Sequence, residues 1–249
     1  MNQQILLITG GGRGIGAAVA LLAARRGFAV AVNYASNSLA ADEVVRTIRA
    51  GGGSAIAVQA DVGDETQVMA MFEKVDARLG RLTALVNNAG VVDMQARVDE
   101  MSVARLERMF RINVIGSFVC AREAVRRMST KHGGTGGAIV NVSSAASRLG
   151  SPGQYVDYAA SKGAIDTFTL GLAKEVADEG IRVNAVRPGL IETDIHASGG
   201  MPERAAMLAP TVPMKRTGTP DEIAGAIVWL LSPEASYTTA ALLDVTGGR

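Results

Sequence analysis

The sequence of 249 residues contains one cysteine and two histidines. The single thiol, Cys120, cannot form an internal disulfide, and two histidines cannot build a histidine-rich metal site. These counts exclude disulfide-stabilised secreted modules and zinc modules, and we expect no bound metal.

Net charge and long apolar runs are also lacking. Lys and Arg number 25 against 24 Asp and Glu, so charge gives no reason to expect a nucleic-acid or membrane-surface partner. No apolar stretch approaches the ~18–20 residues that a membrane span requires. Residues 1–4 lack the basic start of a signal peptide. We expect a soluble, cytoplasmic protein with no nucleic-acid and no membrane partner.

Aromatic residues are scarce at 4%, whereas apolar residues make up 48% of the chain. The core is therefore built from Ala, Val, Ile and Leu. Glycine is abundant: 29 of the 249 residues, about 12%, are glycine, against an average of roughly 7%. Most of these glycines lie singly or in short clusters between apolar runs, which indicates tight turns and close backbone approaches.

Short apolar runs alternate with longer segments of helical pattern along the whole chain. We predict strands at residues 5–9, 28–32, 55–59, 82–87, 138–142, 181–186 and 241–245. We predict helices at residues 14–26, 38–50, 64–79, 102–128, 155–179 and 221–231. This alternation predicts an α/β fold, a doubly wound seven-stranded parallel sheet with helices on both faces, in one domain spanning residues 1–249.

Several helix ends carry their own signals. Asp64 and Thr219 are each followed three residues later by Gln or Glu, the pattern of a capping box. Gly27, Gly80 and Gly180 follow predicted helices where a left-handed residue is favoured.

Residues 191–218 interrupt the alternation with two adjacent glycines, three prolines and three methionines. Connections longer than ~12–15 residues in compact domains are usually functional. Because this segment follows the carboxyl end of a predicted strand, we interpret it as a mobile loop region that covers a substrate.

The first predicted strand runs directly into Thr9-Gly10-Gly11-Gly12-Arg13-Gly14-Ile15-Gly16 and then into a helix. Glycines allow a sharp turn and close approach to a pyrophosphate, and the helix N-terminus supplies N–H donors and partial positive charge. The context of strand, glycine turn and helix predicts a dinucleotide-phosphate site.

This turn resembles that of the short-chain dehydrogenase/reductase family, in its branch of roughly 250 residues. Further matching motifs run along the chain: Asp61-Val62, Asn87-Asn88-Ala89-Gly90, Asn113-Val114 followed by Gly116, Asn141-Val142-Ser143-Ser144, Tyr158-Ala159-Ala160-Ser161-Lys162, Pro188-Gly189 and Ile191-Glu192-Thr193-Asp194. The resemblance implies a single-domain Rossmann fold and hydride transfer between a nicotinamide and a carbonyl or secondary alcohol.

The resemblance also implies which residues hold the cofactor. The expected cofactor-binding residues are Gly10, Gly12, Arg13, Gly14, Ile15, Gly16, Asn33, Tyr34, Ser36, Asp61, Val62, Asn88, Ala89, Gly90, Tyr158, Lys162, Pro188, Gly189, Ile191 and Thr193.

Tyr158 and Lys162 are four residues apart and therefore share one face of a helix. We expect the nearby ammonium to favour the phenolate of Tyr158. The resemblance implies that Tyr158 exchanges the proton, that Lys162 also holds the nicotinamide ribose, that Ser144 hydrogen-bonds the substrate carbonyl, and that Asn113 anchors a water in the proton relay.

Alternatives remain for two of these positions. Ser143 and Ser147 lie close to Ser144, and Ser144 precedes Tyr158 by 14 positions where 13 is more usual in the family. Tyr155 precedes Tyr158, although only Tyr158 has a lysine four residues later.

The end of the second predicted strand indicates which cofactor is used. A site for NAD commonly has Asp or Glu there to accept from the ribose hydroxyls, but here no acid occurs before Asp42. Asn33 and Ser36 could donate to a 2′-phosphate, and Arg13 could supply the opposite charge. We predict NADP, with NAD as the second choice.

The substrate class stays open at this stage. We favour a sugar, a polyol or a small ketone, with a 3-oxoacyl carrier-protein reductase as the first alternative and a catalytically silent NADP-binding regulator as the second. The resemblance implies a homotetramer assembled through helices 102–128 and 155–179 and the C-terminal strand. Near that strand Ala240 replaces the usual glycine, which is costly if the position needs a positive φ.

Overall fold

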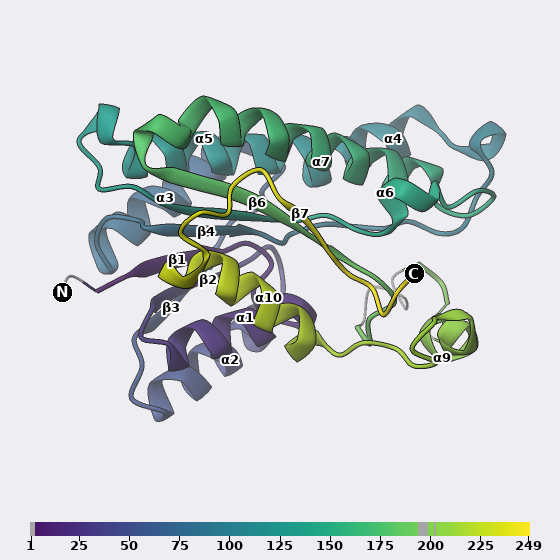
Figure 1. Ribbon diagram of the computed structural model, residues 1–249, viewed down its shortest axis with the longest axis horizontal. Helices are drawn as coiled ribbons and strands as arrows, with labels where there is room; N and C mark the ends of the chain where they lie inside the picture. The colour runs from purple at the N-terminus through teal and green to yellow at the C-terminus, as the bar shows by residue number, and fades with distance from the viewer. Residues whose placement is uncertain (1–2, 194–198, 202) are drawn as a thin grey trace.

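The computed structural model describes residues 3–193, 199–201 and 203–249, and its centre is one seven-stranded parallel sheet (Figure 1). The strand order is β3-β2-β1-β4-β5-β6-β7, which is the doubly wound arrangement predicted. The strands are β1 Ile5–Ile8, β2 Ala29–Tyr34, β3 Ala55–Gln59, β4 Ala84–Asn87, β5 Gly137–Val142, β6 Ile181–Pro188 and β7 Leu242–Val245.

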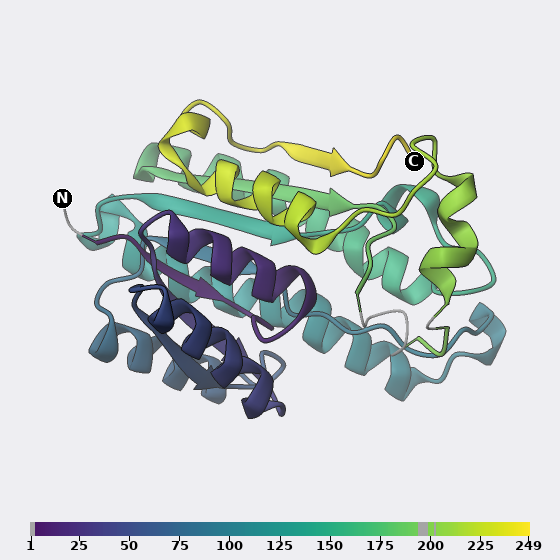
Figure 2. The same ribbon diagram turned by 90° about the horizontal axis from the view of Figure 1, so that it is seen from below.

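Helices cover both faces of the sheet (Figures 1 and 2). One face carries α1 Gly14–Arg25, α2 Ser38–Ala50 and α10 Pro220–Leu231, and the other carries α3 Glu65–Arg78, α4 Val103–Phe110, α5 Gly116–Met128 and α7 Val156–Val176. Alternate residues of β1 serve the two resulting cores: Leu6 and Ile8 pack with α1 and α10, whereas Ile5 and Leu7 pack with α3 and α5. No helix within the described residues is both long and apolar enough to cross a membrane.

Short helical segments complete the described chain. They are α6 Ala146–Leu149, α9 Arg204–Leu208 and the 3-10 turns Val98–Glu100, Thr130–His132, Ala177–Glu179, Ala209–Thr211 and Pro233–Ala235. In Figure 2, α9 lies beyond the carboxyl ends of the strands, on the side where open α/β sheets bind their ligands.

The predicted helix ends are confirmed, although only Thr219 forms the full capping box, since the Gln67 side chain accepts from Asp61 instead of Asp64. The side chain of Asp64 accepts from the Gln67 backbone N–H, and Thr219 forms a capping box with Glu222 at the start of α10. Gly27, Gly80 and Gly180 all have positive φ values, of 93°, 106° and 78°.

The helix predicted across residues 102–128 is wrong in one respect. A π-helical turn at Arg111–Ile115 separates α4 from α5, and Asn113 lies inside it. The hydrophobic pattern predicts helix throughout because a π turn adds one residue without ending the helix. Such turns frequently occur at functional sites.

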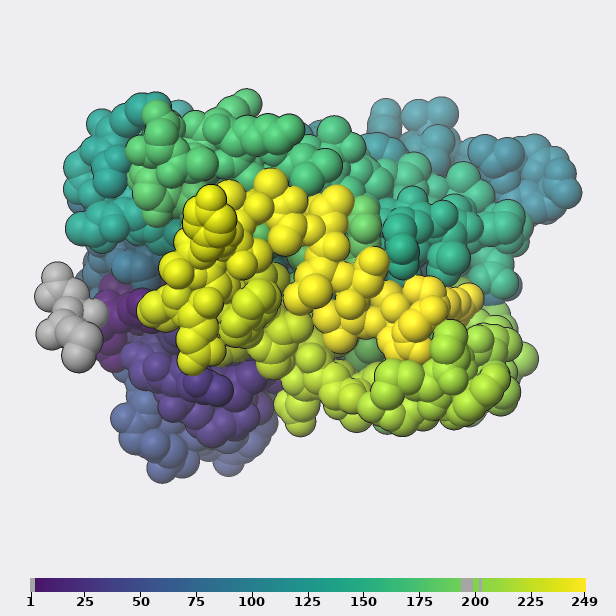
Figure 3. All heavy atoms as spheres, in the orientation of Figure 1, coloured from purple at the N-terminus to yellow at the C-terminus, as the bar shows by residue number. Residues whose placement is uncertain are grey.

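The two ends of the loop region 191–218 pair with each other beside the end of β6. Ile191 and Gly218 form an isolated parallel bridge, and the Gly218 N–H donates to the Leu190 carbonyl at 2.9 Å. Residues 194–198 and 202 of this region lie outside the described residues. The Met214 N–H donates to the Gly247 carbonyl at 3.1 Å, so the C-terminal segment lies against the loop region, as Figure 3 shows on the molecular surface.

Ala240 adopts the left-handed conformation that its glycine-like position suggested, with φ at 59°. Its N–H donates to the Val183 carbonyl at 2.8 Å, which holds the backbone in this conformation beside β6. An L-residue at positive φ costs about 1–2 kcal/mol, whereas glycine adopts this conformation freely.

We expect Ala240→Gly to raise the free energy of unfolding by about 0.5–1 kcal/mol, because relief of strain exceeds the entropy that glycine adds to the unfolded chain. Thermal melting followed by circular dichroism should show a rise in Tm of about 1–3 °C. The control is Ala241→Gly, at the neighbouring residue without positive φ, which should lower Tm. A lower Tm for Ala240→Gly would contradict the assignment of strain to this residue.

Candidate active site

The glycine turn between β1 and α1 leaves no room for side chains. A Cβ at Gly10 would lie 3.1 Å from the Ala89 Cα, and one at Gly16 would lie 2.4 Å from the Gly10 carbonyl oxygen. Arg13 occupies the N-cap of α1, but its side chain makes no capping hydrogen bond. The turn therefore presents backbone and the start of a helix, which fits a pyrophosphate.

Polar side chains from β4 and the end of β1 hold this turn in place. The Thr9 hydroxyl accepts from the N–H groups of Asn88 and Ala89, each at 3.0 Å. The Asn88 amide donates to the carbonyls of Thr9 at 2.9 Å and Gly10 at 3.0 Å. The expected cofactor residues Asn88 and Ala89 thus shape the glycine turn through hydrogen bonds within the protein.

Asn33 does not match its expected role as a side-chain donor to phosphate. It is 1% exposed; its Oδ1 accepts from the Gly10 N–H at 3.1 Å, and its Nδ2 donates to the carbonyls of Val58 and Ala60. Because the amide is buried and already bonded, Asn33 instead supports the glycine turn. The pattern of the sequence could not distinguish an amide turned inward from one turned outward.

A cavity of about 490 Å³ opens beside this turn at the carboxyl ends of the strands. Its lining includes, from the expected residues, Ile15, Asn88, Gly90, Ser144, Tyr158, Lys162, Pro188, Gly189, Ile191 and Thr193. Thr193 lies against the glycine turn, since a Cβ on Gly14 would be 3.3 Å from its methyl group. The cavity therefore lies between the start of α1, the end of β6 and one face of α7.

Other expected cofactor residues surround the turn without lining the cavity. Tyr34 is the last residue of β2, and Ser36, two residues later, is exposed. The Asp61 carboxylate accepts from the Gly63 N–H at 2.8 Å, and Val62 is buried. Gly12 lies against the first turn of α2, where its Cβ would be 3.2 Å from the Ala41 nitrogen.

Tyr158, Lys162 and Ser144 converge in the cavity. The Ser144 hydroxyl hydrogen-bonds the Tyr158 side chain, and the Lys162 Nζ lies 5.6 Å from the centroid of the Tyr158 ring. Lys162 is buried, and its Nζ donates to the Val142 carbonyl at the end of β5, at 2.7 Å. A carbonyl oxygen placed beside Ser144 and Tyr158 would meet two hydroxyl groups.

The expected phenolate is wrong for this arrangement. Burial raises the pKa of Tyr158, and the Ser144 hydrogen bond and the charge of Arg204 oppose that rise only in part. Burial also lowers the pKa of Lys162, to about 8. At neutral pH Tyr158 is therefore a protonated phenol, suited to donate a proton. Helical spacing brought the two groups together but could not reveal that Lys162 is buried and Tyr158 half-buried beside the cavity.

The structure separates the alternatives to Ser144 and Tyr158. The Ser143 hydroxyl is buried and donates to the Lys162 carbonyl at 3.2 Å, and the Ser147 hydroxyl donates to the Ser144 carbonyl at 2.8 Å. The Tyr155 hydroxyl donates to the Gly199 carbonyl at 3.1 Å. Of these candidates, the structure pairs Ser144 with Tyr158.

The Asn113 side chain is buried in the π turn and bonded on both sides. Its Oδ1 accepts from the Val91 N–H at 2.8 Å, and its Nδ2 lies within hydrogen-bonding distance of the Val91 carbonyl and the Ser161 hydroxyl. Asn113 therefore connects the loop after β4 to α7 immediately before Lys162.

Sequence reasoning missed two cationic residues that line the cavity, Arg204 and Arg249. Arg204 belongs to α9 in the loop region, and its guanidinium lies 5.5 Å from the centroid of the Tyr155 ring. Neither arginine belongs to a motif or a periodic pattern, so the sequence contained no signal for them. The exposed Met207 and Met214, by contrast, are not among the lining residues.

Known proteins that resemble this chain in sequence or in structure include oxidoreductases. The family profile described as "Enoyl-(Acyl carrier protein) reductase" matches residues 10–249. The chain is 57% identical over 247 residues to the uncharacterized oxidoreductase YgfF of Escherichia coli, covering 99% of this chain and 100% of that protein.

Two further relatives cover the whole chain. Glucose 1-dehydrogenase 2 of Bacillus subtilis is 38% identical, with 95% of its length covered, and the 3-oxoacyl-[acyl-carrier-protein] reductase of Synechocystis is 39% identical, with 97% covered. A solved Serratia marcescens short-chain dehydrogenase/reductase, a double mutant, is 33% identical and superimposes with a TM-score of 0.90 over 98% of this chain and 97% of that chain. With this fold, glycine turn and group of side chains, the chain belongs to the short-chain dehydrogenase/reductase family of oxidoreductases.

Proposed function

We propose that this oxidoreductase uses NADP and transfers a hydride between the nicotinamide and a carbonyl or secondary alcohol of a sugar, a polyol or a small ketone. The observation that carries the proposal is the meeting of Ser144, Tyr158 and Lys162 in a cavity that also reaches the glycine turn. A reactive carbonyl and a dinucleotide could thus be held in one space.

In the direction of reduction, bound NADPH would supply a hydride to the carbonyl carbon and become NADP⁺. The Ser144 hydroxyl orients the carbonyl oxygen, and Tyr158 donates its phenolic proton to that oxygen as negative charge develops. Lys162 keeps a positive charge beside the phenol at neutral pH and would bind the nicotinamide ribose. The raised pKa of Tyr158 keeps the phenol protonated at neutral pH, so that its proton is present for donation as charge develops on the carbonyl oxygen.

Asn113 has a positioning role in this proposal. Its bonds to Val91 and Ser161 hold α7 against the loop after β4. Gly90 in that loop lies close to Asn113 and Lys162, since a Cβ added to Gly90 would be 3.4 Å from Asn113 Oδ1 and 3.6 Å from Lys162 Nζ. The side-chain amide of Asn113 already forms hydrogen bonds with protein groups, so any contribution of Asn113 to a water relay would come through its backbone.

The corner beyond β2 supports the choice of NADP. It lacks an acidic residue that would repel a 2′-phosphate, since the first acid after the strand is Asp42. Arg13 belongs to the glycine turn next to this corner, Ser36 is exposed there, and the first turn of α2 packs on Gly12. A guanidinium beside a helix N-terminus is a favourable environment for a phosphate.

Two other functions deserve comparison. A 3-oxoacyl carrier-protein reductase is the first alternative, supported by the relative of that name and by the shared carbonyl chemistry. A silent NADP-binding regulator is less well supported, because Tyr158 and Lys162 are both present and both line the cavity. The loop region 191–218 would cover the substrate, since its described residues Thr193 and Arg204 also line the cavity.

We also propose a homotetramer. Val103, Ile115 and Phe118 expose apolar side chains along α4 and α5, and the Phe118 ring stacks on Phe168 of α7 with centroids 3.7 Å apart. Trp229 and Tyr237 form a second exposed site, near the C-terminal strand. Two apolar surfaces on different elements would support two kinds of two-fold contact.

The first experiment tests the proton donor. We expect Tyr158→Phe to lower kcat for NADPH-dependent ketone reduction at least ~100-fold, because the acid is lost, while NADPH still binds. Steady-state kinetics and fluorescence titration of NADPH measure the two effects. Tyr155→Phe removes a nearby hydroxyl that bonds Gly199, and it should change kcat far less. The assignment fails if the two variants exchange these behaviours or if Tyr158→Phe keeps near-normal turnover.

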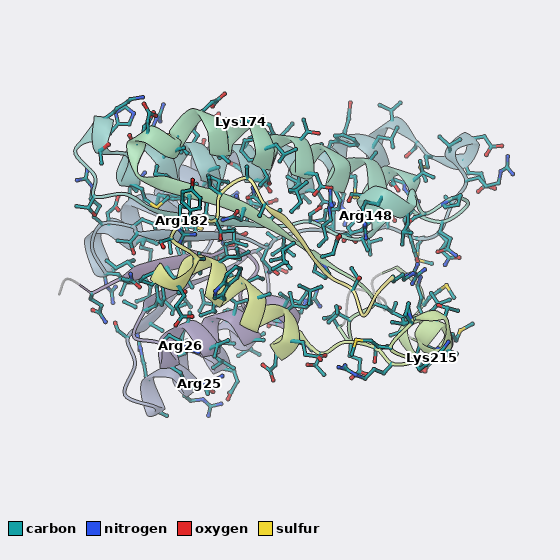
Figure 4. The ribbon with its side chains drawn as sticks, in the orientation of Figure 1. Arg25, Arg26, Arg148, Lys174, Arg182 and Lys215 are labelled. Carbon is teal, nitrogen blue, oxygen red and sulfur yellow. The ribbon has the colours of Figure 1, made fainter. Side chains whose placement is uncertain are left out.

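The second experiment tests the choice of cofactor. Arg13→Ala should raise KM for NADPH about tenfold or more and leave KM for NADH nearly unchanged, because only NADPH carries the 2′-phosphate. The control is Arg25→Ala, which removes the same charge from the other end of α1 (Figure 4), about 18 Å along the helix axis. Equal effects of Arg13→Ala on both cofactors, or a preference of the unaltered protein for NADH, would contradict the proposal.

The third experiment tests assembly. Light scattering coupled to gel filtration at micromolar concentration should give about four times the chain mass of 25.8 kDa. Phe118→Glu should reduce that mass, because it places a charge in the proposed contact along α5. Leu39→Glu alters a more exposed leucine on α2 and should leave the mass unchanged. A monomeric mass for the unaltered protein would refute the tetramer.

A further inference from the structure

The cavity has an unbalanced charge. Three of its lining residues are cationic, namely Lys162, Arg204 and Arg249, and none of the described lining residues is Asp or Glu. Lys162 lies beside Tyr158 and has a place in the proposed chemistry. Arg204 and Arg249 come from the loop region and the C-terminal segment, and the proposed hydride transfer gives them no role.

Arg204 is held in place chiefly by neutral groups. Its Nη2 donates to the Gln154 Oε1 at 3.1 Å, and its guanidinium lies over the Tyr155 ring. Within the described part of the chain, no carboxylate lies within 4 Å of it to form an ion pair. Burial lowers the pKa of Arg204; among the smaller effects, Tyr155 and Tyr158 raise it and the positive charge of Arg249 lowers it. The cost of burying the guanidinium would be offset by an anion beside it.

The other partly buried arginines near the site differ from Arg204 in this respect. Arg105 pairs with Asp157 at 2.7 Å, Arg187 pairs with Asp166 at 2.9 Å, and both guanidinium groups are mostly buried. The more exposed Arg148 of α6 (Figure 4) pairs with Asp244 at 3.3 Å. Among these four arginines near the cavity, only that of α9 has no carboxylate partner in the described chain, although Arg182, elsewhere in the fold, also bonds backbone carbonyls alone.

Arg204 is also close enough to the reacting group to influence it. Its charge is one of the causes that lower the pKa of Tyr158 against the larger effect of burial. A small molecule in the cavity could thus contact Arg204 and Tyr158 together. Guanidinium groups bind carboxylates and phosphates through paired hydrogen bonds, and such bonds are stronger where little water is present.

We propose that the substrate is an anionic carbonyl compound, whose carboxylate or phosphate group binds Arg204 and Arg249 while its carbonyl oxygen meets Ser144 and Tyr158. This inference rests on the proposed function and narrows its substrate class to small oxo acids and phosphorylated ketones or sugars. Electrostatic attraction holds the substrate at one end, so that the carbonyl is oriented at the other.

The test compares matched pairs of ketones with and without the charge. The pairs are acetoacetate and its methyl ester, 4-oxopentanoate and its methyl ester, and dihydroxyacetone phosphate and dihydroxyacetone, each with NADPH. For at least one pair, we expect KM of the anion to be at least tenfold lower than that of its neutral partner. The pair that shows the difference distinguishes a carboxylate from a phosphate.

Three variants locate the effect. Arg204→Gln should raise KM of the preferred anion at least tenfold and that of the neutral partner less than twofold, whereas Arg204→Lys should restore part of the anion preference. Lys215→Gln makes the same charge change at an exposed lysine next to α9 (Figure 4) and should alter neither KM. Equal losses for anion and neutral partner in Arg204→Gln would overturn the proposal, because they would assign Arg204 a purely structural role.

Failure of the proposed function can be distinguished from failure of this inference. If the neutral ketones are reduced and the anions are not preferred, the oxidoreductase function stands and the anion site is refuted. If no ketone is reduced, calorimetric titration of 4-oxopentanoate and of dihydroxyacetone phosphate into the protein with NADP⁺ decides the remaining question. Binding that weakens at least tenfold in Arg204→Gln supports the anion site, and no binding by the unaltered protein overturns it.

Discussion

The glycine turn must stay open to a ligand, yet its glycines have no side chains with which to hold its shape. Residues at the ends of β1, β4 and β2 meet this constraint. Thr9 and Asn88 fix the turn on the side of β4, and the Asn33 amide accepts from Gly10 on the side of β2. These bonds fix the backbone of the turn without adding a side chain at any of its glycines. The rest of the site is positioned relative to this fixed backbone.

Buried side-chain hydrogen bonds also connect the ends of neighbouring strands to α7 across the sheet. Asn87 donates to Asn141 on the next strand, and Asn141 donates in turn to Thr169 of α7. The strand ends are thereby joined laterally to the helix that carries Tyr158 and Lys162. A buried hydrogen-bonded chain of this kind stabilises one relative position of strand and helix, because any shift would leave buried amide groups unpaired. The distance between the glycine turn and Tyr158 therefore depends on side chains that contact no ligand.

The elements that the sequence predicted well are those governed by local patterns. Strands and helices followed apolar periodicity, and the caps at Asp64 and Thr219 followed side-chain chemistry three residues apart. The features it could not predict depend on burial and on distant contacts. The inward orientation of Asn33, the raised pKa of Tyr158 and the approach of Arg204 to the cavity all arise after folding, from groups far apart in the chain.

The π turn at Arg111–Ile115 has a geometric consequence for the two ends of its helix. One inserted residue rotates everything that follows by about 100° relative to an uninterrupted α-helix. Arg105 on α4 contacts α7 through its bond to Asp157, and Phe118 on α5 contacts the same helix by stacking on Phe168. The π turn therefore lies between two contacts with one neighbouring helix. Adding or removing a residue there would rotate one of these contacts away from α7 while the other stayed in place.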